Sequence, residues 1–233
     1  MRSAWIVLPL ALVSRSTVAQ DRSAAVVAVP VFQEPRHHVV FENALVRVLD
    51  VRIPSGDTTL YHLHADRTVG VVISSARAWH QTPGQPASPV DTLAAPVGSI
   101  LDNASESLPY THRVGNADTV TLRYVVGQLL SSSGVDAPAL PASSGLRLDH
   151  EMAGARVYRV TLAPGQSTEV HRHVQPGLTV EVGPGALRLE GTAPEAASPH
   201  AGAGKWWWRG AGTQHVLKNV GAQPLEVVEI DWR

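Results

Sequence analysis

Two stretches of the sequence, RVLDVRIPSGDTTLYHLH (residues 47–64) and RVYRVTLAPGQSTEVHRH (residues 156–173), align without a gap. Both begin with Arg-Val and contain a glycine, five further residues and then His-x-His. The histidines are His62 and His64 in the first stretch, and His171 and His173 in the second. Because alternate side chains of a strand share a face, each histidine pair is predicted to point to one side.

A third histidine follows each pair at the same place in both halves. His112 opens HRVGN (residues 112–116) and His215 opens HVLKN (residues 215–219), each followed four residues later by an asparagine. Unrelated packing would not repeat with these spacings, so the chain is interpreted as an internal duplication with a histidine trio in each copy. Asn116 and Asn219 are expected to hold the turn beside the third histidine rather than to bind a ligand.

The remaining sequence predicts an all-β chain. Short runs rich in β-branched residues, such as TVTLRYVVGQ (119–128) and PLEVVEIDW (224–232), alternate with Gly, Pro, Asn and Asp, and no run has convincing helical periodicity. The segment SSSGVDAPALPASSG (131–145) has little to bury and reads as a linker. We therefore expect an N-terminal domain over residues 20–130 and a C-terminal domain over residues 146–233.

The first nineteen residues have the layout of a signal peptide. Arg2 precedes an apolar run from Ala4 to Val13 and a small-residue exit ending at Ala19. We expect a mature chain that begins near Gln20 and is periplasmic or secreted. No other segment is long and apolar enough to span a membrane.

Composition excludes several classes of function. The 19 basic and 20 acidic residues are nearly balanced, so neither nucleic acid nor an anionic membrane is an expected partner. There is no cysteine, which excludes thiolate metal sites and thiol nucleophiles. Histidine, carboxylate, tyrosine and serine must carry the chemistry.

The repeated motifs resemble those of the cupin superfamily, and the duplication resembles a bicupin. GQSTEVHRH (165–173) and GDTTLYHLH (56–64) fit the start of the first cupin motif. GAGTQHVLKN (210–219) fits the second motif except that Gly210 replaces its proline, and SLPYTHRVGN (107–116) keeps only His112 and Asn116. The resemblance covers nearly all of the mature chain. It implies two tandem cupin barrels, each a double-stranded β-helix of the jelly-roll type with histidines pointing inward.

One departure from the family pattern affects the expected site. Where cupins usually carry a metal-binding glutamate, four residues after His-x-His, this sequence has Val69 and Leu178. The expectation is therefore an apolar wall at that position and three imidazoles in each barrel, as in the minority three-histidine cupins. The resemblance implies that a divalent transition metal (Fe, Mn, Ni, Cu or Zn) is held by six histidines, namely His62, His64, His112, His171, His173 and His215.

Three functions stay open at this stage. The favoured one, implied by the three-histidine cupins, is an exported metal-dependent enzyme that cleaves a small oxygenated organic molecule with dioxygen. The others are a redox-neutral isomerase, lyase or hydrolase in which the metal acts as a Lewis acid, and a non-catalytic module that binds a metal or small ligand. A metal without a protein carboxylate favours an anionic substrate. Family habit suggests a homodimer, and Tyr110, two residues before His112, is a candidate catalytic acid or base.

Other residues are expected to play structural or surface roles. Five histidines have no counterpart in the other half and are expected on the solvated surface: His37, His38, His80, His150 and His200. Glu181 is expected to point away from the barrel interior. Trp206 and Trp208 should share one face, where a core position with an inter-barrel or dimer contact is favoured over substrate stacking.

Overall fold

The structure of the protein is a computed structural model that describes residues 26–91, 93–199 and 201–233. The signal-like segment 1–19 and His200 lie outside the described residues. Within the described ranges there is no α-helix, and the only helical elements are two 3₁₀ turns, η1 (Val31–Gln33) and η2 (Ala142–Ser144). The all-β prediction is confirmed. None of these described elements is a helix that could cross a bilayer.

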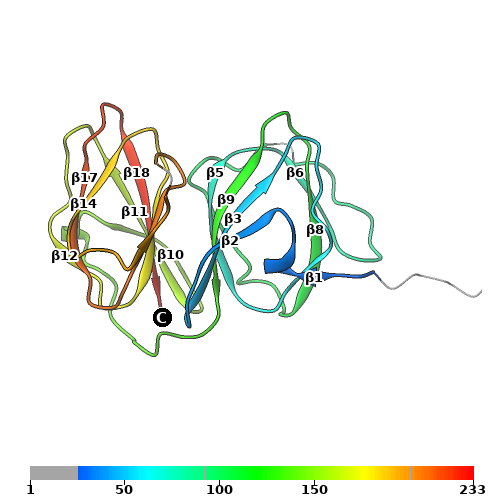
Figure 1. Ribbon diagram of the computed structural model, residues 1–233, viewed down its shortest axis with the longest axis horizontal. Coiled ribbons are helices and arrows are strands. Elements are labelled where there is room, and N and C mark those ends of the chain that lie inside the picture. The colour runs from blue at the N-terminus through cyan, green and yellow to red at the C-terminus, as the bar shows by residue number, and fades with distance from the viewer. Residues whose placement is uncertain (1–25, 92, 200) are drawn as a thin grey trace, which may run out of the picture.

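The strands of each half form two sheets that enclose a barrel (Figure 1). In the N-terminal half a five-stranded sheet has the order β2-β3-β9-β5-β7, and a four-stranded sheet has the order β1-β4-β8-β6. The strands are β1 (Val29–Pro30), β2 (His37–Glu42), β3 (Val46–Ile53), β4 (His62–His64), β5 (Thr68–Ser74), β6 (Ala78–Gln81), β7 (Ile100–Asp102), β8 (Tyr110–Asn116) and β9 (Leu122–Leu129).

The C-terminal half repeats this architecture. Its larger sheet has the order β10-β11-β18-β13-β16-β15, and its smaller sheet has the order β12-β17-β14. The strands are β10 (Arg147–Met152), β11 (Ala155–Leu162), β12 (His171–Arg172), β13 (Gly177–Glu181), β14 (Leu187–Gly191), β15 (Ala196–Ala197), β16 (Trp206–Arg209), β17 (Gln214–Asn219) and β18 (Leu225–Trp232). The chain therefore consists of two tandem β-barrels.

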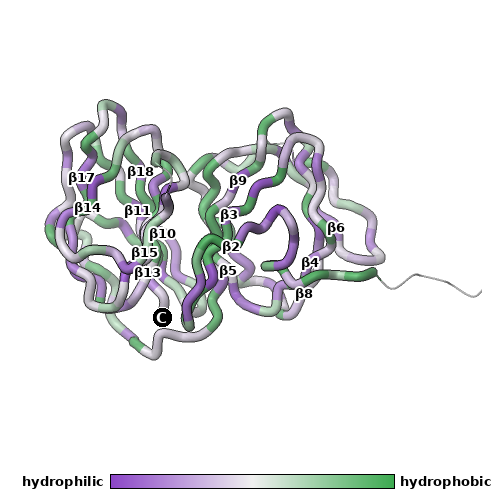
Figure 2. Tube along the Cα trace, in the orientation of Figure 1, coloured by the Kyte–Doolittle hydropathy of each residue, from purple (hydrophilic) through white to green (hydrophobic). Residues whose placement is uncertain are grey.

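The two barrels share a hydrophobic core. Residues from the outer faces of both larger sheets form one buried cluster, which includes Val48 and Val71 from one barrel and Val180 and Ile230 from the other. Hydrophobic segments accordingly gather where the barrels meet (Figure 2). Burial at about 25 cal/mol per Å² of apolar surface makes such a contact a major stabilising feature.

The tryptophan triplet joins this contact as predicted. The Phe41 ring lies 5.8 Å from the Trp206 ring and 5.9 Å from the Trp208 ring, between centroids. Trp207, on the opposite face of β16, packs inside the C-terminal barrel. Strand alternation thus assigns the three rings to two different cores.

The orientation predicted for the residues after His-x-His is wrong. Leu178 and Val69 lie in the inter-barrel core, whereas Thr179, the next residue after Leu178, faces the histidine cluster. Glu181 shares the parity of Thr179 and is only 2 % exposed, so the expected surface position is also wrong. Pairing of β13 with β18, at Leu178–Ile230, determines this face. A glutamate at position 178 would lie against apolar side chains instead of near a metal.

The two repeated asparagines have the structural role predicted for them. The Asn116 side-chain amide donates to the carbonyls of Ile53 and Val120, at 2.9 and 2.7 Å. Asn219 makes the equivalent pair of hydrogen bonds in the second barrel, at 3.0 and 2.8 Å. Each asparagine therefore ties the end of its histidine-bearing strand to neighbouring loops.

Candidate metal centres

The N-terminal barrel brings its three predicted histidines together. His62 and His64 extend from β4, and His112 extends from β8 directly opposite His62 in the antiparallel pairing. Each ring offers a nitrogen, and the three nitrogens lie within 4.8 Å of one another. His64 Nε2 and His112 Nε2 are 3.2 Å apart, a spacing that places two ring nitrogens around one point.

The Nδ1 atoms of His62 and His64 differ in their hydrogen bonds. His62 Nδ1 donates to the Leu60 carbonyl at 2.9 Å, which leaves its Nε2 lone pair for the cluster. His64 Nδ1 is buried without a hydrogen-bond partner among the described residues. An imidazole that donates one N–H to the protein and directs the other nitrogen at a shared point is the usual arrangement of a metal ligand.

Burial keeps this trio neutral. Desolvation is the main cause that lowers the pKa of His62 to about 4, of His64 to about 3 and of His112 to about 2. Neutral imidazole is the form that binds transition metals, so the cluster meets the chemical requirement for a divalent ion. The site fits a metal held by three nitrogens with positions left for other ligands.

These pKa shifts predict an acid-sensitive metal-free protein. Because the folded pKa values lie below the unfolded value, the unfolded state binds more protons below about pH 6.5, and stability falls as the pH falls. Each fully shifted histidine contributes up to about 1.4 kcal/mol per pH unit. We expect the melting temperature of chelator-treated protein to be lower at pH 5 than at pH 6.5.

Between pH 6.5 and 5 the buried carboxylates with lowered pKa, Glu229 and Asp231, add no slope, whereas His215, whose pKa burial also lowers, adds to the slope with the same sign as the trio. His173, whose pKa is raised by net interaction with Glu229 and Asp231 against burial, contributes a constant amount below pH 6.5. Replacing the exposed His38 with Gln is the control and should leave the pH slope unchanged. Equal melting temperatures at the two pH values would contradict the prediction.

A cavity adjoins the N-terminal histidines. It has a volume of about 230 Å³ and is lined by all three histidines and by apolar side chains from β3, β8 and β9. These apolar residues include Leu49, Ile53, Val114 and Val126. Ligand pockets usually measure about 300–1,000 Å³, so this cavity suits a small molecule with an apolar body.

Tyr110 lines the same cavity. Its ring stacks on His64 with 4.7 Å between centroids and an interplanar angle of 3°. Burial raises the pKa of Tyr110 to about 12, against a smaller lowering by Asn103. The phenol is therefore protonated at neutral pH and is suited to donate a hydrogen bond.

Two histidines expected on the solvated surface also reach this cavity. His37 is 9 % exposed, and its ring lies 4.7 Å from that of His62. His80 is exposed but lines the cavity beside His112, at 5.9 Å between ring centroids. His38 is exposed as predicted, and His150 lies 2.9 Å from an Asp102 oxygen. The prediction is wrong for His37, which belongs to the site.

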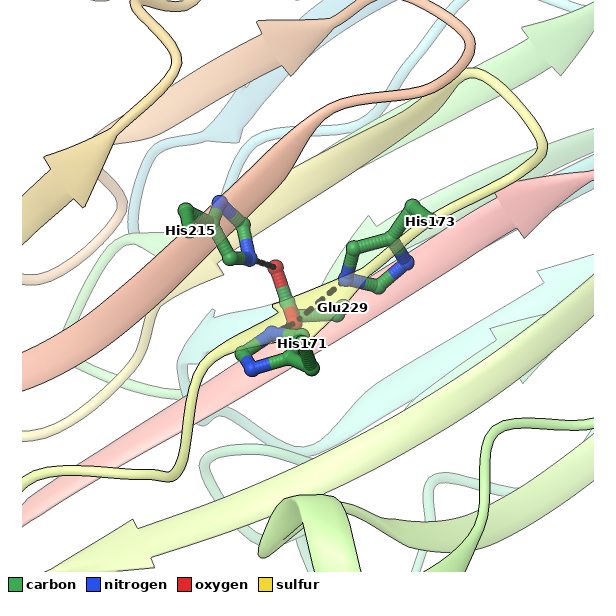
Figure 3. A group of neighbouring side chains, drawn as sticks. All are labelled: His171, His173, His215 and Glu229. Atoms are coloured by element: carbon green, nitrogen blue, oxygen red, sulfur yellow. Dashed lines mark hydrogen bonds and ion pairs between the residues drawn. The ribbon is translucent and has the colours of Figure 1, made fainter.

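The C-terminal barrel also brings its three histidines together, but with a carboxylate among them. The rings of His171, His173 and His215 converge on Glu229 from β18 (Figure 3). Their Nε2 atoms lie 3.2, 3.1 and 3.3 Å from the Glu229 oxygens. The expectation of three histidines alone is therefore corrected for this barrel.

Buried polar groups surround Glu229 and tie it to an arginine. The Thr179 hydroxyl donates to Glu229 Oε1 at 2.7 Å, and Arg209 Nε lies 3.4 Å from the same oxygen. Arg209 also donates to Asp231 Oδ1 at 2.8 Å, and His173 Nδ1 lies 2.8 Å from that oxygen. Arg209 is 1 % exposed, so the cluster holds a fully buried guanidinium.

The two carboxylates of the C-terminal cluster carry more charge than Arg209 alone neutralises, and His173 supplies a second cation when protonated, because interaction with them raises its pKa against burial. Burial alone would raise the pKa of Glu229 and Asp231, but His173 and Arg209 lower it, so both carboxylates are ionised. One guanidinium cannot neutralise two buried carboxylates. His171 and His173 donate their Nδ1 hydrogens elsewhere, to the Glu169 carbonyl and to Asp231, and direct Nε2 at Glu229. A lone pair aimed at a carboxylate needs a proton or a metal between them, so the donor set fits a divalent ion.

Glu229 was missed because its strand reads as an apolar core strand. In LEVVEIDW (225–232) the acidic residues Glu229 and Asp231 alternate with Val228, Ile230 and Trp232. Two carboxylates at alternating positions of a central strand share one face, and burying them requires partners. The alternation of acidic and apolar residues in this strand is the sequence feature that could have revealed Glu229 as a buried site residue.

Aligned positions show how the two sites have diverged. Leu49 and Tyr158 occupy equivalent positions opposite Val126 and Glu229, which are themselves equivalent. Gly70 pairs with Val126 as Thr179 pairs with Glu229. The N-terminal barrel thus has small apolar residues around its histidines, where the C-terminal barrel has larger and charged ones.

The chain is similar to known proteins in structure but not detectably in sequence. No family model matches the sequence, and no curated protein matches it. Solved structures match well in fold. AerE from Microcystis aeruginosa is 12 % identical over 86 % of this chain and 98 % of its own, with a TM-score of 0.52.

Two metabolic enzymes are also similar in structure. A salicylate 1,2-dioxygenase from Pseudoaminobacter salicylatoxidans, a single-residue mutant in complex with gentisate, is 12 % identical over 87 % of this chain and 76 % of its own, with a TM-score of 0.56. Oxalate decarboxylase from Bacillus subtilis, which has Mn(II) centres, is 15 % identical over 82 % of this chain and 69 % of its own, with a TM-score of 0.51. Together with the paired barrels and their inward histidines, these likenesses show that the chain has the fold of two tandem cupin barrels.

Proposed function

We propose that the protein is a metal-dependent bicupin enzyme that acts on a small oxygenated organic molecule in its N-terminal barrel. The observation that carries the proposal is the histidine trio in the wall of a cavity of about 230 Å³. His62, His64 and His112 would hold the metal. When bound, a redox-active ion supplies a binding place for dioxygen and for anionic oxygen atoms of the substrate.

The residues of the cavity would bind and orient the substrate. Leu49, Ile53 and Val126 provide an apolar surface for its body and exclude water from it. Tyr110 is protonated at neutral pH, and its hydroxyl group would donate a hydrogen bond to a substrate oxygen. The trio carries no negative protein ligand, so the dication charge favours a carboxylate or another anion as the bound group.

Dioxygenase-type cleavage is the reaction we favour. In such a reaction one carbon–carbon bond of the substrate breaks, both atoms of dioxygen enter the product, and the substrate supplies the electrons, so no external reductant is needed. Support comes from the three-nitrogen donor set and from the structural likeness to a salicylate 1,2-dioxygenase. The likeness to oxalate decarboxylase supports metal dependence more broadly.

The test uses protein produced in its native host with the leader kept, so that it loads its own metal. Iron, manganese, nickel or copper by elemental analysis, with dioxygen uptake on a panel of small hydroxy and keto acids and both ¹⁸O atoms in the product, is the expected result. Zinc with turnover but without dioxygen uptake would establish the redox-neutral alternative instead. A protein without bound metal or turnover would indicate a binding module.

We also propose that the protein is exported. The basis is the signal-like layout of residues 1–19, which lie outside the described residues. Intact mass spectrometry of the natively expressed protein is expected to give a chain that begins near Gln20, recovered from the periplasmic or secreted fraction. Recovery of residues 1–19 on a cytoplasmic protein would refute the proposal.

A further inference from the structure

A buried carboxylate–histidine pair lies beside the N-terminal trio, outside the repeated motifs. Glu34 follows η1 and is 1 % exposed, and His37 begins β2. Glu34 Oε2 lies 2.7 Å from His37 Nδ1. His37 lines the cavity, and its ring lies 4.7 Å from that of His62.

The pair is held rigidly from behind. Glu34 accepts hydrogen bonds from the backbone N–H groups of Arg36 and Leu60, at 2.6 and 3.1 Å. These contacts and His37 hold the pKa of Glu34 at about 2 despite the opposing effect of burial. An ionised carboxylate only accepts hydrogen bonds, so the hydrogen of His37 is on Nδ1. With Nδ1 bonded to Glu34, Nε2 is the nitrogen left to accept a hydrogen bond, and the described residues provide no partner for it.

The second barrel shows that the fold does not need a histidine here. Leu146 immediately precedes β10, and continuing the register of β10 on β11 by one residue places it at the position that His37 occupies on β3. Leu146 is 2 % exposed and belongs to the hydrophobic cluster inside the C-terminal barrel. A buried Glu–His pair in place of a core leucine costs desolvation, which points to a role for its unpaired nitrogen.

We propose that His37 is a substrate-binding residue whose Nε2 accepts a hydrogen bond from a hydroxyl group of the ligand, with Glu34 fixing the tautomer. The inference rests on the proposed function and narrows its substrate to hydroxyl-bearing carboxylates of about the size of one ring. The dication would attract the carboxylate of the substrate, and the apolar walls of the cavity would enclose its apolar part. His37 would distinguish a hydroxyl group from a group that cannot donate a hydrogen bond.

The probes are 2-hydroxybenzoate and 2-fluorobenzoate, which have similar volume but differ in the donor. Their affinities for the metal-loaded protein are measured by isothermal titration calorimetry, without turnover and under anaerobic conditions. Chelation alone gives some preference for the hydroxyl compound, so the informative quantity is the change in this preference between variants. Wild-type protein is expected to bind 2-hydroxybenzoate more tightly.

Two variants of His37 test the roles of its two ring nitrogens separately. In His37→Asn the side-chain amide replaces Nδ1 and keeps the bond to Glu34 but leaves nothing at Nε2, so the preference should fall about tenfold. In His37→Gln the amide reaches the Nε2 position, and part of the preference should return. Metal content and melting temperature of His37→Asn should match wild type, which a purely structural role would not allow.

Three outcomes would overturn the inference: an unchanged preference in His37→Asn, loss of metal from that variant, or failure of both probes to bind wild-type protein. Failure of the proposed reaction gives a different pattern. The preference and its loss in His37→Asn would then be observed, while no probe or hydroxy acid is consumed with dioxygen.

Discussion

Glu229→Gln is expected to lower the free energy of unfolding by about 3–5 kcal/mol, because it removes one partner from a fully buried ionic cluster. Glu229 is 0 % exposed and lies within 3.4 Å of Arg209 and within 3.3 Å of three histidine nitrogens. The neutral amide keeps the shape of the side chain but leaves the guanidinium with Asp231 as its one buried carboxylate partner among the described residues. Chemical denaturation of the metal-free protein measures the effect without a contribution from metal binding.

A matched control is available on the protein surface. Glu190 is exposed and lies 4.0 Å from Lys218, so Glu190→Gln should change the free energy of unfolding by less than about 1 kcal/mol. The double change of Glu229 and Arg209 to Gln should cost less than the sum of the single changes, because it removes the unpaired charge as well. A loss below about 1 kcal/mol for Glu229→Gln would show that the cluster does not depend on this carboxylate.

Paired histidine replacements are expected to separate the two barrels. Wild-type protein should hold about two metal ions per chain, and replacing both His62 and His64 with Ala should leave about one. This variant should lose turnover completely, because it removes two of the three ligands beside the cavity. Elemental analysis and dioxygen uptake provide the measurements.

Replacing both His171 and His173 with Ala should also leave about one ion but should keep measurable turnover. Its main effect should be lower stability, since Glu229 and Asp231 lose buried partners. Loss of turnover in this variant at unchanged folding, with turnover retained in the other, would assign the reaction to the C-terminal barrel. Two ions in either variant would show that the replaced histidines are not ligands.

The fold could be predicted because its signal is repeated. A glycine, His-x-His and a later histidine recur with equal spacing, and the strands that carry them are short and rich in β-branched residues. All six histidines meet in the two clusters as the spacing indicated. The spacing works because histidines two residues apart share a strand face, and the third is brought opposite by strand pairing, His62 with His112 and His171 with His215.

The rest of the site depends on pairing between distant strands. Leu178 was assigned to the wrong face because counting along the chain crosses the loop between His173 and β13, where alternation is interrupted. His37 and Glu229 join their sites from β2 and β18, far from the motifs in sequence. Neither position has a counterpart of the same type in the other half, since Leu146 and Val126 occupy them, so the repeat itself concealed both residues.

The shared core has a consequence for how the two halves can diverge after duplication. On the faces that meet between the barrels, equivalent positions stay apolar: Val48 matches Val157, Val71 matches Val180, and Val69 matches Leu178. At the inward-facing positions the two halves differ, since Leu49 corresponds to Tyr158 and Val126 corresponds to Glu229. A substitution at the shared face changes the packing of both barrels, whereas a substitution inside one barrel changes the packing of that barrel alone. A change inside one lumen can therefore alter that barrel's site while the packing between the barrels is kept.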